Sequence, residues 1–265
     1  MSNMIDLLDH PLRSSKPRDQ GLTHVLDRGL AVSAVDALAE VAGEFVDIVK
    51  LGWGTALITG NLDAKLARYR AHGIPVVFGG TLLEIAIAQD RLESVLSWIV
   101  GLGLEHIEVS DGTITMAHDQ KLELIERLAR DFVVMSEVGS KDDTKIMAPY
   151  RWVELIQSEL EAGAWKVVAE ARESGTSGIY RHDGEVRMGL IDEIVHAVPP
   201  DKLLFEAPQK DQQVWFIRRL GADVNLGNVV PDDVLSLETM RLGLRADTAL
   251  GEVGSGIVGE GVRSE

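Results

Sequence analysis

Eight short apolar segments recur along the chain, and each is followed by polar or glycine residues and then by a helical pattern. The segments span residues 22–27, 45–52, 74–80, 106–112, 132–139, 164–172, 202–208 and 222–228. Strands that alternate with helices at this pitch form a parallel sheet with right-handed crossovers. Eight such units in 265 residues predict an α/β fold, a single-domain (β/α)8 TIM barrel. An open doubly wound sheet is the alternative.

Three of the intervening segments have the amphipathic spacing of helices. They span residues 62–73, 119–131 and 211–221. Asp119 and Asp211 are the candidate N-caps of the second and third helices, and Gly73 and Gly221 are candidate stops for the first and third. We expect an N-terminal segment over 1–20, the barrel over 21–250, and a flexible, glycine-rich tail over 251–265.

Several classes of function lack their usual marks in this sequence. No G-x-G-x-x-G follows the first strand, and there is no P-loop motif. The absence of cysteine removes disulfides, thiolate nucleophiles and cysteine-ligated zinc. No H-x-H or H-x-x-x-H pair suggests a histidine zinc site, and no serine lies in a G-x-S-x-G context.

The charge and hydropathy of the chain favour a cytoplasmic protein that binds small molecules. A net charge of −16 disfavours nucleic acid as a partner, although basic residues gathered locally would still bind an anion. The sequence contains no run of about 18 uncharged apolar residues, so we expect no membrane-spanning helix. The first 19 residues contain no continuous apolar region typical of a secretory signal.

Polar residues gather at the ends of the predicted strands and not at their starts. They are Asp27, Lys50, 79–81, 110–112, Glu137, Glu170, Arg172, Glu206, Asn225 and Asn228. In a barrel all eight strand ends meet on one face, where the active site is built. The alternative is that some of these groups form a satisfied ionic network that only fills the barrel.

Carboxylates and cations at these ends indicate the chemistry. Glu137, Glu170 and Glu206 end three successive strands, and such oxygen ligands suit Mg²⁺. Lys50 is a possible amine nucleophile of an aldolase, but beside so many carboxylates we expect it to stay protonated and to bind an anion. A ring of cations around metal-binding carboxylates suits a small, multiply anionic substrate.

A set of motifs, in a fixed order from about Lys16 to about Leu250, carries a family resemblance. The motifs are KPRDQGLTHVLDRGL, VDIVKLGWGT, FGGTLLEIA, IEVSDGTITM, SEVGSKD, EARESGTSGIY, FEAPQKDQQVWFI and NLGNVVPDDVLSLETMRLGLRADT. With them the chain resembles the phosphosulfolactate synthase family. The resemblance implies a (β/α)8 barrel and the Mg²⁺-dependent addition of sulfite to phosphoenolpyruvate. The product would be (2R)-2-phospho-3-sulfolactate, an early intermediate of coenzyme M biosynthesis.

Site roles are assigned as hypotheses beside this resemblance. Glu137, Glu170 and Glu206 are expected to hold Mg²⁺, directly or through water. The candidate catalytic residues are Lys50, Lys141 and Arg172, which are expected to bind the substrate carboxylate and sulfite. Lys50 is also the candidate proton donor to C2 of the substrate. The candidate substrate-binding residues are Lys16, Arg18, Ser174, Gly227, Asn228 and Arg245. Glu84 and Asp111 are expected to support them.

The expected partners are phosphoenolpyruvate, sulfite and further copies of the chain, with no nucleic acid or membrane. Plant members of the family include a heat-stress-associated protein, so membership constrains the fold more than the reaction. Two alternatives therefore remain. One is an enzyme of the same fold that uses another nucleophile or phosphorylated acid, and the other is a non-catalytic stress or interaction protein.

Overall fold

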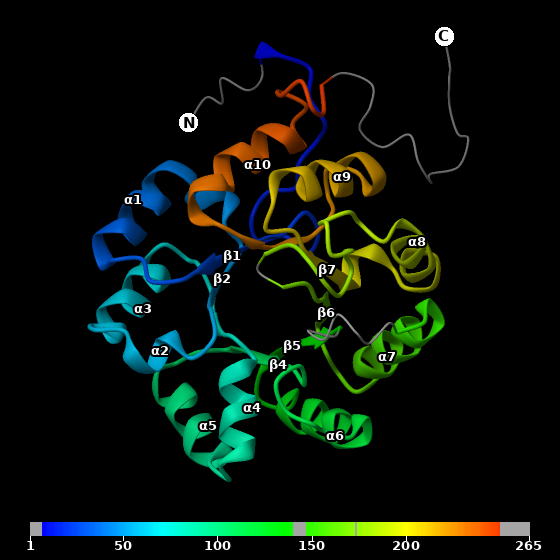
Figure 1. The fold of residues 1–265 in the computed structure, drawn as a ribbon. Helices are drawn as coiled ribbons and strands as arrows, with labels where there is room; N and C mark the ends of the chain where they lie inside the picture. Colours follow the sequence, from blue (N-terminus) through cyan, green and yellow to red (C-terminus); the bar gives the residue numbers. More distant parts are fainter. Residues whose placement is uncertain (1–6, 140–146, 173, 250–265) are drawn as a thin grey trace.

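Eight parallel strands form the centre of the molecule, and helices surround them (Figure 1). The strands are β1 (Thr23–Asp27), β2 (Ile48–Leu51), β3 (Val76–Phe78), β4 (His106–Val109), β5 (Val133–Val138), β6 (Lys166–Ala169), β7 (Leu203–Glu206) and β8 (Leu226–Val229). The predicted (β/α)8 barrel is confirmed, and the open doubly wound sheet is wrong. This computed structural model describes residues 7–139, 147–172 and 174–249. Lys141 and the predicted tail over 251–265 lie outside them.

Backbone pairing runs round the barrel in the order β3-β2-β1-β8-β7-β6-β5-β4. Strands β3 and β4 therefore face each other across a seam, and in the described residues they contact each other without a hydrogen-bonded ladder. At the carboxyl end of this seam, the backbone N–H of Gly80 donates to Oε1 of Glu108 at 2.6 Å. A side chain thus joins the two strands where backbone pairing does not.

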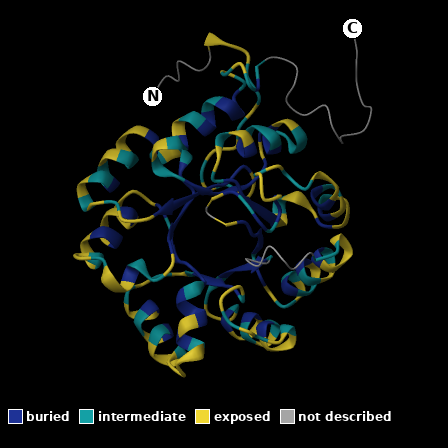
Figure 2. Ribbon diagram, in the orientation of Figure 1, coloured by how far each residue is buried: buried dark blue, intermediate teal, exposed yellow. Residues whose placement is uncertain are grey.

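The helices pack their apolar faces on the strands and expose their polar faces, so the buried residues form a ring around the barrel centre (Figure 2). In chain order they are α1 (Val32–Ala42), η2 (Gly43–Phe45), α2 (Thr55–Ile58), α3 (Leu62–Ala71), α4 (Thr81–Ala88), α5 (Leu92–Gly101), α6 (His118–Leu128), α7 (Pro149–Glu161), α8 (Met188–Ala197), η3 (Pro200–Lys202), α9 (Lys210–Leu220), η4 (Pro231–Asp233) and α10 (Val234–Arg241). None of the described helices is long and apolar enough to cross a membrane.

Two predicted N-caps are wrong by two residues. The N-cap of α6 is Ala117, and that of α9 is Gln209. Asp119 and Asp211 instead lie in the first helical turns, where a carboxylate is stabilised by the helix dipole. The chain here uses glutamine, three residues after each cap, to accept the N-cap N–H, a signal that an aspartate-based reading overlooks.

The inside of the barrel contains a small apolar cluster, separate from the larger core between strands and helices. It consists of Ile48, Met135, Val168 and Leu204, with Trp165 packed against it. These side chains come from four different strands and close the barrel interior. Because strand residues two positions apart share a face, the next inward side chain on each of these strands lies closer to the carboxyl end.

Candidate active site at the carboxyl end of the barrel

The inward positions that follow the apolar cluster are all charged. They are Lys50, Glu137, Glu170 and Glu206. Each is buried, and each comes two residues after a member of the apolar cluster, as the strand period of two requires. The sequence therefore places an apolar layer below and a charged layer above it, at the end of the barrel where such folds bind substrates.

Lys50 lies at the centre of this charged layer. Its Nζ atom is 3.0 Å from Oε1 of Glu137 and 3.1 Å from Oε2 of Glu108. Oε1 of Glu206 is 3.2 Å from the same atom. One ammonium group on β2 is thus shared by carboxylates from β4, β5 and β7. We call these four residues the Lys50 cluster.

The electrostatics of the Lys50 cluster favour a charged lysine and disfavour full ionisation of the carboxylates. Burial alone would lower the pKa of Lys50, but the attraction of the three carboxylates outweighs burial and raises that pKa well above 10.5. Burial and the charge of Glu137 raise the pKa of Glu108 to about 8, against a lowering by Lys50. Burial also raises the pKa of Glu206. A firmly held Lys50 ammonium is a poor proton donor at neutral pH, which disfavours that predicted role.

Glu108 is the member of the cluster that sequence reasoning missed. It lies within β4 and not at the strand end, so a search of strand ends passes over it. A usable signal exists: Glu108 is a charge in the middle of an apolar strand and lies two residues before Ser110, so both side chains have the same parity.

Backbone donors and a second buried lysine hold the carboxylates in place. The N–H of Ala171 donates to Oε2 of Glu206 at 2.8 Å. Lys121, which is buried in α6, donates to the main-chain carbonyl of Glu137 and forms ion pairs with Glu159 at 2.8 Å and Asp111 at 3.0 Å. Asp111 is therefore linked to the Lys50 cluster through Lys121.

Glu84 supports the loop after β4. One of its oxygens accepts from the Ser110 hydroxyl at 2.6 Å. The other accepts from the backbone N–H groups of Thr113 and Ile114, the latter at 2.9 Å. A buried carboxylate of α4 therefore fixes the β4–α6 loop beside the Lys50 cluster.

A cavity of about 390 Å³ opens above the Lys50 cluster. Its lining residues are Leu26, Lys50, Gly52, Trp53, Gly79, Gly80, Thr81, Glu108, Glu137, Glu170, Ala171, Arg172, Ser174, Glu206 and Asn228. Seven of the predicted site residues are therefore gathered at one cavity: Lys50, Glu137, Glu170, Arg172, Ser174, Glu206 and Asn228. The cavity holds both charge signs, as a site for an anion and a cation requires.

Asn228 has the features of a ligand-binding residue. Its side chain is buried, and its Oδ1 atom has no hydrogen-bond partner among the described residues. Its backbone is left-handed, with φ of 54°, and its N–H lies 3.4 Å from Nδ1 of the buried His24. A buried amide oxygen without a partner among the described residues, at a cavity wall, is suited to a polar substrate group.

Trp53 is a second lining residue that the sequence analysis did not select. Its φ of 52° is a rare conformation for a bulky residue, and its side chain is 41% exposed at the cavity. Backbone conformations of this kind concentrate at functional sites. The glycines on either side of Trp53 were the available signal.

Lys16 and Arg18 lie at the opposite end of the barrel from the cavity, so their predicted substrate role is corrected. Lys16 donates to the carbonyls of Gly43 and Val46, which precede β2. Arg18 lies 3.3 Å from a carboxylate oxygen of Asp47, at the same end. Both cations anchor the N-terminal segment beneath the barrel.

Two further predicted substrate-binding residues are absent from the cavity wall. A Cβ atom on Gly227 would lie 2.3 Å from Leu204 and 3.1 Å from His24, so this glycine serves close packing inside the barrel. The Arg245 guanidinium donates to the Ser236 hydroxyl at 2.5 Å. Neither residue contributes to the site as the structure describes it.

Two polar residues at predicted strand ends are structural. Asp27 points away from the cavity and accepts from Lys65 at 2.6 Å and from Tyr69 at 2.8 Å. Asn225 lies at the amino end of β8, where its Oδ1 accepts from the N–H of Leu22. Strand parity therefore turns Asp27 away from the cavity, whereas its position at the amino end of β8 keeps Asn225 from it.

The carboxylates do not form a ready-made metal cage. Within the described ranges, no group of three or more His, Cys, Asp or Glu side chains is arranged to hold a metal ion. Lys50 stands among three of the carboxylates, where a cation would otherwise lie. The wall nevertheless carries four carboxylates, an excess of negative charge that fits a divalent cation held by one or two of them together with substrate oxygens.

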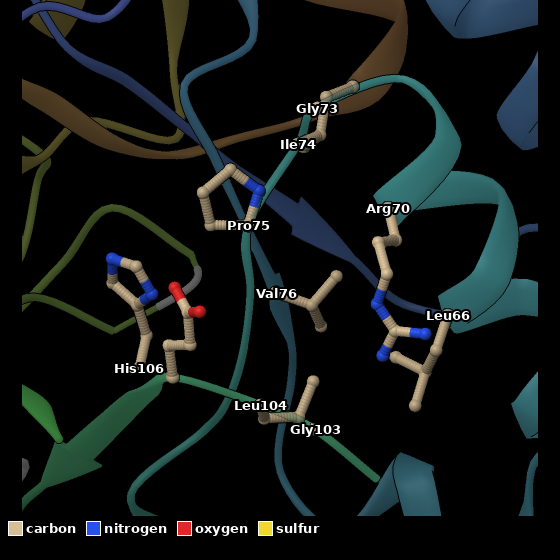
Figure 3. Close-up of a pocket in the computed structure, with 10 residues that line it drawn as sticks. Leu66, Arg70, Gly73, Ile74, Pro75, Val76, Gly103, Leu104 and His106 are labelled. Atoms are coloured by element: carbon tan, nitrogen blue, oxygen red, sulfur yellow. The ribbon is translucent and has the colours of Figure 1, made fainter. Parts of the chain in front are cut away.

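A second pocket, of about 230 Å³, lies at the amino end of the seam between β3 and β4 (Figure 3). It is lined by Leu66, Arg70, Gly73, Ile74, Pro75, Val76, Gly103, Leu104, Glu105 and His106. The Arg70 guanidinium donates to the carbonyl of Leu102 at 2.8 Å, which ties α3 to the approach to β4. None of the predicted site residues lines this pocket.

The eight-stranded parallel sheet, with a charged cavity at its carboxyl end, defines a protein of the (β/α)8-barrel class. Solved structures with the same fold include the YdjI aldolase from Escherichia coli K12, with a TM-score of 0.55 and 12% identity over 81% of this chain and 76% of the aldolase. Another is 3-hexulose-6-phosphate synthase from Salmonella typhimurium, with a TM-score of 0.53 and 15% identity over 86% of this chain and 93% of that chain. At these identities the likeness concerns the fold alone.

The family model for (2R)-phospho-3-sulfolactate synthase (ComA) matches residues 11–247. The chain is 41% identical to a phosphosulfolactate synthase from Methanothermobacter thermautotrophicus, over 95% of this chain and 99% of the relative. It is 40% identical to one from Bacillus subtilis, over 91% and 97%. The chain therefore belongs to the phosphosulfolactate synthase family. As a member it is an enzyme that forms a C–S bond by addition, a lyase-type reaction.

Proposed function

We propose that the chain catalyses the Mg²⁺-dependent addition of sulfite to phosphoenolpyruvate, giving (2R)-2-phospho-3-sulfolactate, in the cytoplasm. The observation that carries the proposal is the Lys50 cluster at the base of a cavity whose wall includes Arg172 and Asn228. Two mutually repelling anions need local cations and fixed polar groups to meet there.

The electron flow sets what the site must supply. The sulfur lone pair of sulfite forms the new bond to C3 of phosphoenolpyruvate. The C2–C3 π pair moves to C2 and onto the carboxylate, and C2 then takes one proton. No bond to phosphorus breaks, so the phosphate is carried through unchanged. Stabilisation of the developing carboxylate charge and delivery of one proton to one face of C2 are therefore the two requirements.

Mg²⁺ fits the excess of carboxylates at the cavity wall. We assign it to Glu170 and to the carboxylates of Glu137 and Glu206, with substrate oxygens and water completing its shell. When bound, it supplies a Lewis acid for the charge that develops on the substrate carboxylate. Because Lys50 already engages Glu137 and Glu206, Glu170 is the member of this set that lies outside the Lys50 cluster.

The remaining residues bind and orient the anions. Arg172 is assigned to a substrate oxyanion, since a guanidinium binds such groups through two parallel hydrogen bonds. Asn228 and Ser174 are assigned to substrate oxygens at the cavity wall. Glu108, with a pKa of about 8, replaces Lys50 as our candidate proton donor to C2. Lys141 stays a predicted sulfite ligand.

The test is to incubate the purified protein with phosphoenolpyruvate, sulfite and Mg²⁺ and to detect phosphosulfolactate by mass spectrometry. We expect product that depends on all three components. Absence of product from folded protein would refute the proposal, and turnover with another nucleophile in place of sulfite would favour the related-enzyme alternative. A folded protein that consumes neither substrate under any of these conditions would favour the non-catalytic scaffold.

The metal assignment has its own test. Glu170→Gln keeps the shape of the side chain and removes its charge, so we expect the apparent Mg²⁺ affinity to fall by about tenfold or more. Mn²⁺ binding to the wild type and the variant, followed by electron paramagnetic resonance, measures this without turnover. Equal affinities would remove Glu170 from the metal site.

We further propose that the chain forms homo-oligomers and supplies sulfolactate to coenzyme M biosynthesis or another sulfonate pathway. Leu57 and Ile58 on α2 support the first part, because these large apolar side chains are 60% and 85% exposed. The net charge of −16 supports small anions over nucleic acid as ligands. Native mass spectrometry measures the oligomeric state.

A further inference from the structure

The loop between β6 and α8 carries two residues of the cavity wall, Arg172 and Ser174. A tight turn sets their backbone. The N–H of Arg172 donates to the carbonyl of Thr176 at 3.0 Å, and the N–H of Gly175 donates back to the carbonyl of Arg172 at 2.8 Å. The position of this turn relative to the barrel therefore determines where the Arg172 side chain leaves the backbone and which part of the cavity it reaches.

The first turn of α9 holds this loop through Gln212. Its Nε2 atom donates to the carbonyl of Gly175 at 2.7 Å and lies 3.4 Å from the carbonyl of Gly184. Its Oε1 atom accepts the backbone N–H of Gln209 at 3.2 Å. The buried Gln212 amide thus bonds through both of its polar atoms. Its oxygen contacts the start of α9, and its nitrogen contacts the loop at Gly175 and Gly184.

Gln209 adds a parallel contact, because its Nε2 atom donates to the carbonyl of Ser174. Gly175 lies directly against both glutamines. A Cβ atom there would be 2.5 Å from Nε2 of Gln212 and 2.9 Å from Nε2 of Gln209, and the backbone has a φ of 72°. Only glycine allows this close approach in this conformation, so the loop is shaped to dock on the glutamine pair.

We propose that Gln212 is a positioning residue for substrate binding, acting through the backbone contacts that join Arg172 to Gly175 and Thr176. It orders the β6–α8 loop against α9 and thereby places Arg172 and Ser174 at the cavity wall. The inference rests on the proposed function for the identity of the substrates. The ordering of the loop is independent of that function.

Gln212→Glu is the matched perturbation. It keeps the oxygen that accepts from Gln209 and replaces the donor amide by an oxygen that faces two carbonyls. Gln213→Glu is the control, because Gln213 lies on the same turn, is equally buried and donates to the Ala207 carbonyl at 3.0 Å, away from the loop. Gln212→Glu loses the short hydrogen bond to Gly175 and the longer one to Gly184, and Gln213→Glu loses the hydrogen bond to Ala207. Both variants place a buried carboxylate against a main-chain carbonyl, so a purely structural effect would appear in both.

The first measurement is backbone hydrogen exchange of residues 174–187 without substrates. We expect exchange about tenfold faster in Gln212→Glu than in wild type, and little change in Gln213→Glu. The second is steady-state kinetics of phosphosulfolactate formation. There we expect the KM for phosphoenolpyruvate or sulfite to rise about tenfold or more in Gln212→Glu, with a smaller change in kcat.

The outcomes separate the two proposals. Unchanged exchange in Gln212→Glu overturns the positioning role, and so does faster exchange with an unchanged KM for both substrates. A similar KM increase in Gln213→Glu overturns it as well, since the effect would then follow general destabilisation. If the wild type makes no phosphosulfolactate, the proposed function fails. The exchange comparison still decides whether Gln212 orders the loop.

Discussion

Replacing Lys50 by methionine tests the electrostatics of the site most directly. Methionine has a similar length and no charge, so the change removes the only ammonium in the Lys50 cluster and leaves three buried carboxylates. Removing one partner of a buried ion pair costs about 3–5 kcal/mol because an uncompensated charge remains. We therefore expect Lys50→Met to lower the free energy of unfolding by about that amount at pH 8.

The loss is expected to depend on pH. The pKa of Glu108 is about 8 in the folded protein, above its ordinary value of 4.5, so the folded state binds this proton more tightly than the unfolded chain does. Its contribution to stability is therefore complete below pH 4.5 and is lost as the pH rises through about 8. In Lys50→Met the lowering of this pKa by Lys50 disappears, and each unit of further rise adds about 1.4 kcal/mol of pH-dependent stability.

The assay is urea unfolding of wild type and Lys50→Met at pH 5.5, 7 and 8 on one protein preparation. The expected result is a deficit for the variant that is largest at pH 8 and smaller at pH 5.5. The double variant with Glu108→Gln is the control. It removes one buried carboxylate and keeps an oxygen for the Gly80 N–H, so it should recover part of the deficit at pH 8. A deficit of equal size at all three pH values would refute this account of the cluster.

Two further substitutions probe the site, and a third probes the amino end of the barrel. In Asn228→Gly the glycine tolerates the φ of 54°, and the change removes only an amide whose oxygen lacks a partner in the described residues. The KM for phosphoenolpyruvate should therefore rise about tenfold, and the stability should be nearly unchanged. Steady-state kinetics measures the first effect and thermal unfolding measures the second. Arg172→Lys keeps the charge but not the paired donors, and kcat/KM should fall about tenfold or more. Lys16→Met should lower the free energy of unfolding by about 1–3 kcal/mol, because two carbonyls lose their donor, and should leave kcat/KM at the wild-type value. A lowered kcat/KM in a folded variant would contradict the position of Lys16 at the amino end of the barrel.

The fold was predictable because the signal repeats. Eight apolar segments at regular spacing, each followed by a helical pattern, leave few arrangements of a parallel sheet, and an error in one segment does not change the result. The helix starts were less predictable, because Gln120 and Gln212 serve in place of a capping aspartate. Local capping has several chemical solutions, whereas the burial of a repeated apolar face has few.

The site was predictable only where strand geometry constrains it. Glu137 and Glu206 were found because the carboxyl ends of parallel strands converge. The N-terminal segment belongs to no strand, so nothing in the sequence indicated that Lys16 would dock at the amino end of the barrel. Gly227 and Asn228 are adjacent, yet Gly227 packs on Leu204 and Asn228 reaches the cavity. The difference comes from close packing at Gly227 and from the left-handed backbone of Asn228, and no sequence motif predicts either feature.

The charge balance of the Lys50 cluster argues against its being a mere filler of the barrel. A network that only fills space gains most when its charges cancel, because every unpaired buried charge lowers stability. Here one ammonium serves three carboxylates, and Glu170 adds a fourth at the same wall. Burial, together with the charges of Glu137 and Glu206, raises the pKa of Glu108 to about 8. Such a site is least stable when empty. A ligand that brings positive charge, or a proton taken up by one carboxylate, would reduce this repulsion, and this is the behaviour that the proposed metal-assisted addition with proton transfer requires.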